Sequence, residues 1–113
     1  MNWGKLDWAV ERRGDARVAV PSGRADESTA TQFTEQLVEA AGEGGLLVLD
    51  LGDVSYMSSR GLRALTLANR RAAEAGGTIV LARPSETMRE ILAISRYDKV
   101  FRVTETVEDA LPD

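Results

Sequence analysis

The chain has 113 residues, of which 43% are hydrophobic and 28% are charged, and its net charge is −4. These values are ordinary for one globular domain with a core of its own, and the negative charge gives no reason to expect nucleic acid as a partner. Cysteine and histidine are both absent. Their absence excludes cysteine nucleophiles, serine–histidine triads and the usual zinc ligands, so we expect neither an enzyme nor a cofactor.

The beginning of the sequence shows no apolar stretch typical of a signal peptide, and no apolar run approaches the length that spans a membrane. We therefore expect a cytoplasmic protein without membrane insertion. Residues 1–113 are predicted to form a single domain with its core in residues 8–111.

The first elements are predicted as a hairpin. Residues 1–7 form a lead-in, and strands are expected over residues 8–12 and 16–20, joined by a turn at Gly14-Asp15. The proline, serine and glycine content of residues 21–26 is typical of a loop.

A helix is predicted over residues 28–41, because Phe33, Leu37 and other apolar residues recur on one side. A near-continuous apolar run from Leu46 to Leu51 then favours a strand that is buried on both faces. A short connector with two serines leads from this strand into a helix over residues 59–75.

The second half continues the alternation of strands and helices. The expected elements are a strand over 78–82, a helix opened by Pro84-Ser85, an edge strand over 100–103 and a short helix over 107–111 capped by Thr106. Such alternation indicates an α/β fold with a mixed, mainly parallel sheet of four to five strands and about four helices packed on it.

The serine pair is the most informative short motif. Either Ser58 or Ser59 can cap the helix that follows, because a serine oxygen accepts hydrogen bonds from the free amides of the first turn. We expect the pair to lie in an exposed turn above the end of the central strand. On pattern alone, capping is a sufficient explanation for both serines.

The helix over residues 59–75 has two distinct faces at helical spacing. Its apolar side, expected toward the sheet, consists of Leu62, Leu65, Ala68 and Ala72. The opposite side gathers Arg60, Arg63, Leu67, Arg70 and Arg71. This side is either a docking surface, with Leu67 as an apolar anchor among steering charges, or a solvated helix face with one exposed leucine.

The order of elements and the serine turn together resemble a STAS domain of the anti-sigma factor antagonist family. The matching stretches are residues 53–62 (DVSYMSSRGL), followed by Leu65 and by residues 76–80 (GGTIV), and residues 23–30 (GRADESTA). The resemblance extends over residues 8–111. It implies a regulatory protein that binds an anti-sigma factor with serine-kinase activity and thereby releases the sigma factor.

The resemblance also implies a phosphorylation switch. By its position before Gly61, Ser59 would be the phosphorylated residue, with Ser58 as the alternative, and a PP2C-type phosphatase would restore the active form. The resemblance and the charged helix face together give the predicted partner-binding residues, which are Asp26, Met57, Ser58, Arg60, Gly61, Arg63, Leu67 and Arg70. Ser58 stands where many members have aspartate, and Arg60 stands where a small residue is common.

Two other functions remain open at the level of sequence. One is a STAS subunit of a lipid-transport or stress-signalling assembly. The other is a nucleotide- or ligand-binding STAS module, which would use the positive end of the helix over residues 59–75 as an anion site.

Overall fold

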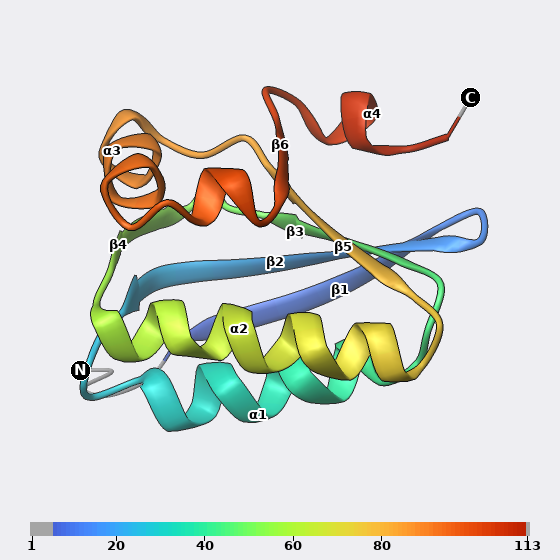
Figure 1. Ribbon diagram of the computed structural model, residues 1–113, viewed down its shortest axis with the longest axis horizontal. Coiled ribbons are helices and arrows are strands. Elements are labelled where there is room, and N and C mark those ends of the chain that lie inside the picture. Colours follow the sequence, from blue (N-terminus) through green and yellow to red (C-terminus); the bar gives the residue numbers. More distant parts are fainter. Residues whose placement is uncertain (1–5, 113) are drawn as a thin grey trace.

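The computed structural model describes residues 6–112, which begin with an antiparallel hairpin (Figure 1). Strand β1 (Asp7–Arg13) pairs with β2 (Ala16–Ala25) over its whole length. Gly14 takes a φ of +63° in the turn between them, a conformation that glycine adopts without steric cost. The predicted hairpin is confirmed.

Strand β2 is longer than the sequence indicated, and the loop predicted over residues 21–26 is wrong for most of its length. Pro21 and Ser22 pair with β1, and Gly23 pairs with Val54 of a further strand. The Gly23 amide donates to the carbonyl of Asp53, the residue just before that strand, with an N–O distance of 3.0 Å. On the side of β2 away from β1, residues 17–19 pair with one strand and residues 23–25 pair with another. Pro21 lies between these two stretches, so its missing N–H removes no hydrogen bond between strands.

The remaining strands are parallel to β2. They are β3 (Leu46–Asp50), β4 (Val54–Met57), β5 (Thr78–Ala82) and β6 (Arg102–Thr104). The sheet order is β1-β2-β3-β5-β6, with β4 pairing to β2 off this path. The mixed, mainly parallel sheet is confirmed. The connector between the central strand and the serines is corrected, because it contains β4, which places the serine turn at the end of β4 and beside the end of β2.

Helices lie on both faces of the sheet. The larger core joins side chains of α1 (Ala30–Ala41), α2 (Ser59–Glu74) and α3 (Glu86–Ile94) to one face, among them Phe33, Leu65 and Met88. A smaller core on the other face joins Val48 and Val80 to the short helix α4 (Val107–Ala110). A single 3₁₀ turn, η1 (Tyr97–Lys99), links α3 to β6.

Helices α1 and α2 run side by side on the same face of the sheet (Figure 1). The side of α2 predicted to be apolar does face inward, since Leu65, Ala68 and Ala72 are buried and Leu62 is partly buried. The opposite side of α2 is therefore held beside α1 and open to solvent, with the serine turn at one end.

Candidate functional site

The serine turn connects β4 directly to α2. Ser58 has extended backbone angles (φ −81°, ψ 177°) and is the N-cap, with its Oγ accepting from the Gly61 amide at 3.3 Å. The Ser58 amide donates to the Ala25 carbonyl at 2.8 Å, which ties the turn to the end of β2. Ser59 is the first residue of the helix, and it is exposed. The two serines, either of which the sequence allowed as the cap, thus differ: Ser58 caps the helix, and Ser59 is exposed to solvent.

Gly61 and Met57 support this turn from beneath. A Cβ at position 61 would lie 2.7 Å from the Ala25 oxygen and 2.6 Å from Cγ of Met57, so only glycine permits this approach of helix to strand. The Met57 side chain is 2% exposed and belongs to the larger core. Both residues were expected at the partner surface, and the structure places them under it.

The loop between β2 and α1 forms the second side of the site. Asp26 organises this loop, because its Oδ1 accepts from the amide and the hydroxyl of Ser28, at 3.0 and 2.7 Å. Its carbonyl accepts from the amides of Thr29 and Ala30, which lead into α1. Asp26, predicted as a partner-binding residue, therefore organises the loop through its own hydrogen bonds.

Hydrogen bonds to the charged form lower the pKa of Asp26 below its ordinary value of 3.8. The Ser28 hydroxyl contributes most, followed by the Ser28 amide. The guanidinium of Arg24 adds a smaller effect, with Nε 3.2 Å from Oδ2. The loop beside Ser59 thus keeps a negative charge over the whole physiological range of pH.

Two contacts that the sequence did not reveal join the pieces of the site. Arg60 lies 3.5 Å from the Glu27 carboxylate, which links the first turn of α2 to the β2–α1 loop. The guanidinium of Arg24 stacks over the Tyr56 ring, 4.5 Å from its centroid, and joins β2 to β4. The pairing of β2 with β4 brings these side chains together, and no signal in the sequence indicated that pairing.

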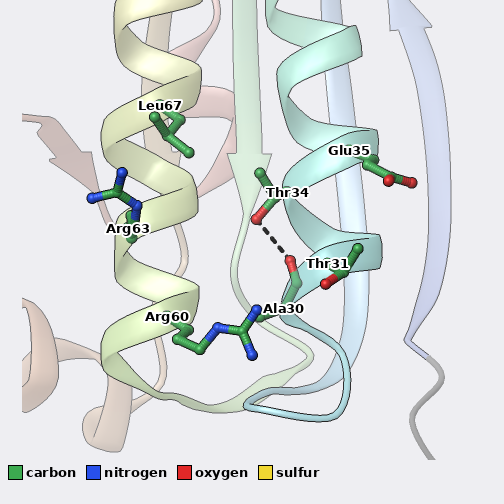
Figure 2. Close-up of a pocket in the computed structure, with 7 residues that line it drawn as sticks. All are labelled: Ala30, Thr31, Thr34, Glu35, Arg60, Arg63 and Leu67. Carbon is green, nitrogen blue, oxygen red and sulfur yellow. Dashed lines mark hydrogen bonds between the residues drawn. The ribbon is translucent and has the colours of Figure 1, made fainter.

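A groove between α1 and α2 continues from the serine turn (Figure 2). It consists of two adjoining hollows of about 350 and 560 Å³ that share Thr34, Glu35 and Leu67. Figure 2 shows Leu67 and Thr34 in the space between the helices, while Arg60 reaches across the end of the groove toward α1. Leu67 is half-buried, so the leucine expected on an open surface instead forms part of the floor of a groove.

The other predicted arginines lie along the same groove. Arg63 lines the hollow nearer the serines, and Arg70 lines the farther one together with Val38 of α1. Both arginines are exposed. The structure thus places Arg60, Arg63, Leu67 and Arg70 along one groove, whereas Met57 and Gly61 are buried beneath the serine turn.

Among residues 6–112, no three acidic side chains gather in a way that could hold a metal ion. Asp50, the last residue of β3, pairs with Arg83, whose Nε lies 2.9 Å from Oδ1 of Asp50. This bond and the Asp50 charge raise the pKa of Arg83. None of the helices in this part of the chain has both the length and the apolar character needed to cross a membrane.

A family model for the STAS domain matches residues 7–110 of this chain. The chain belongs to the STAS domain family. Among curated relatives of this STAS domain is the anti-sigma-F factor antagonist RsfB of Mycobacterium tuberculosis, which is 33% identical over 90 residues, covering 79% of this chain and 73% of RsfB. BtrV of Bordetella bronchiseptica, also named as an anti-sigma factor antagonist, is 31% identical over 94 residues, covering 82% and 81% of the two chains.

Solved structures share the fold. An anti-sigma factor antagonist from Mycobacterium paratuberculosis superposes with a TM-score of 0.84 at 23% identity, covering 95% of this STAS domain and 92% of that chain. The phosphorylated form of the Bacillus cell fate determinant SpoIIAA gives a TM-score of 0.68 at 21% identity, covering 92% and 96%. The predicted family and fold are therefore confirmed.

Proposed function

We propose that this STAS domain is a cytoplasmic anti-sigma factor antagonist, which binds an anti-sigma factor with serine-kinase activity and thereby releases the sigma factor. Phosphorylation of Ser59 by that kinase ends the binding, and a PP2C-type phosphatase restores it. The names of the relatives support the first half of this proposal, and the geometry of the serine turn supports the second half.

The main support for the proposed switch is that the two serines have different structural roles. The Ser58 oxygen already accepts the Gly61 amide, whereas Ser59 is exposed at the first position of α2. A kinase can reach the Ser59 hydroxyl without dismantling the cap. We therefore assign the phosphate to Ser59 rather than to Ser58.

The position of Ser59 suits a residue that gains negative charge. The helix N-terminus carries unpaired amides and the positive end of the helix dipole, both of which favour an anion. Arg60 adds a fixed positive charge next to it, now 3.5 Å from Glu27. The folded domain should accept the phosphate, so that the effect of modification falls on the partner.

The proposed docking surface combines the turn with the groove between α1 and α2. Ser58 belongs to the turn, Arg60 and Arg63 line the near end of the groove, and Leu67 and Arg70 lie along it. Asp26 fixes the neighbouring loop. Met57 and Gly61 shape this surface from below instead of contacting the partner.

The test is phosphorylation of the purified protein by a co-encoded serine kinase of the anti-sigma type with ATP, followed by mass spectrometry. We expect one phosphate on Ser59, no phosphate in Ser59→Ala, and an unchanged modification of the matched variant Ser58→Ala. A phosphate on Ser58, or no modification by any co-encoded kinase, contradicts the proposed switch.

A further inference from the structure

Strand β1 forms one margin of the sheet. Within residues 6–112 it pairs with β2 alone, in an unbroken register from Asp7 opposite Ser22 to Arg13 opposite Ala16. In an antiparallel pair, alternate residues direct their amide and carbonyl groups away from the partner strand. The outer side of β1 therefore presents a row of groups ready to pair with another strand.

Some of the usual protections of such a margin are missing from β1, although four of its seven residues, Asp7, Glu11, Arg12 and Arg13, are charged. Its seven residues contain no proline and no lysine, and no bulge interrupts their register with β2. Val10, at the centre of the strand, is 49% exposed, which makes it one of the few large exposed apolar residues among those that the structure describes. In Figure 2, β1 is the pale blue strand at the right of the view, on the far side of α1 from α2.

We propose that β1 pairs with β1 of a second copy of this chain, antiparallel and about a two-fold axis at Val10. This inference does not depend on the proposed function. It places Asp7 of each copy opposite Arg13 of the other, and all seven residues of the strand find a partner. Opposite charges and apolar pairs placed directly across two strands stabilise their pairing.

The charges of β1 select this register over its neighbours. When the same edges of two copies pair antiparallel, the two-fold axis is perpendicular to the sheet, and the helices of both copies lie on the same side. Residues that lie opposite each other share a face of the sheet, so one residue must pair with its own counterpart at the axis. An axis at Ala9 would set Asp7 opposite Glu11 of the second copy, and an axis at Glu11 would set two glutamates face to face. Both arrangements place like charges across from each other, which destabilises a strand pair.

The other face of the strand is also complementary. Trp8 and Arg12 lie opposite Pro21 and Arg17 of β2, and paired residues share a face. With the axis at Val10, Trp8 of one copy meets Arg12 of the other, a pairing of an aromatic ring with a guanidinium. Val10 meets its own counterpart between them.

Two strands of seven residues bury less surface than a stable dimer needs, so we expect a weak association that depends on concentration. The test is sedimentation equilibrium of the 113-residue chain from about 10 μM to about 1 mM, starting from a monomer mass of 12.3 kDa. The mass should rise toward twice this value. Val10→Lys should raise the dimer dissociation constant at least about fivefold, because it sets two like charges face to face.

The matched control is Val100→Lys, which makes the same change at a residue that is 62% exposed and lies next to η1, away from β1. It should associate as the wild type does. A wild type that stays monomeric at about 1 mM, or equal association by Val10→Lys and the wild type, overturns the proposal. Equal losses in Val10→Lys and Val100→Lys also overturn it, since net charge would then explain both.

A charge exchange tests the register itself. Asp7→Arg alone and Arg13→Asp alone each create two like-charged pairs, so each variant should lose self-association. An equimolar mixture of the two restores both opposite-charged pairs, and it should form a heterodimer of wild-type strength. Thermal unfolding of each variant checks that its fold is intact. A folded mixture that remains monomeric rules out this register.

Discussion

Arg17 is a charged residue that the structure buries. It is 6% exposed, and its guanidinium donates to the carbonyl of Ala40 in the last turn of α1 and to that of Gly44 in the loop after the helix. Its Nη1 also lies 3.6 Å from the Glu43 carboxylate. The last carbonyls of a helix lack partners within the helix and carry its negative dipole end, so a cation here satisfies and complements them.

Arg17→Met keeps the apolar stem and removes the donors. We expect the free energy of unfolding to fall by about 2–3 kcal/mol, because buried carbonyls lose charged hydrogen-bond donors. Urea denaturation measures this change. Arg12→Met is the matched control, since Arg12 is exposed opposite Arg17 on β1, and it should cost under about 0.5 kcal/mol. Equal losses in the two variants would contradict the role given to Arg17.

Asp26 provides a prediction about pH. Its pKa is lowered in the folded state, chiefly by the Ser28 hydroxyl, so its bonds favour folding above the unfolded pKa. That contribution is lost as the pH falls through the folded pKa. Carbon-detected NMR titration should give Asp26 a pKa below 3.8 in the wild type and a higher one in Ser28→Ala. The same Asp26 pKa in both proteins would show that the hydroxyl has no such effect.

At the scale of elements, α2 serves both the core and the proposed partner surface. Its inner side buries Leu65 and Ala68 under the sheet, while its outer side forms one wall of the groove with α1. Because α1 lies beside α2, the Leu67 side chain is half-buried. It forms part of the apolar floor of the groove and still remains accessible to a partner. A partner that buries this floor would gain from desolvation without any repacking of the core.

Leu67→Ala should therefore weaken binding of the anti-sigma factor by about tenfold or more, as expected for an apolar anchor at an interface. The free energy of unfolding should fall by no more than about 1 kcal/mol, because the side chain is only half-buried. Isothermal titration and urea denaturation measure the two effects. Ile94→Ala, at a residue 84% exposed on α3, is the control and should leave affinity unchanged. Unchanged affinity in Leu67→Ala would remove the groove from the interface.

The sequence predicted the four α-helices of residues 6–112, because apolar spacing and capping are local signals, and their alternation with strands indicated the mainly parallel sheet. Apolar spacing defined α2, and the Thr106 cap defined α4, where the Thr106 Oγ accepts from the Asp109 amide at 3.0 Å. Strand β4 was missed because four residues are too few to show alternation, and its pairing with β2 decides it. That same pairing places Arg24 and Tyr56 beside the serine turn, so this part of the site was missed as well.

At the scale of the whole molecule, the fold separates the stability of the domain from its proposed signal. The larger core lies between the sheet and the helices, whereas Ser59 is exposed at the end of α2, supported by buried Met57 and by the Ser58 cap. A dianion at Ser59 meets solvent, free amides and Arg60 on this side. A partner that covers the turn would have to remove this charge from water.

The phosphorylated and unphosphorylated forms should consequently unfold at nearly the same urea concentration. Their free energies of unfolding should agree within about 1 kcal/mol. Their affinities for the anti-sigma factor should differ by more than a hundredfold, because burying an uncompensated phosphate costs about 3 kcal/mol or more. Titration calorimetry of both forms measures the difference, with phosphatase-treated protein as the control that must regain full affinity. If the two forms bind equally well, the charge at Ser59 does not control the partner. If the phosphorylated form unfolds much earlier, the modification acts on the fold instead of on the interface.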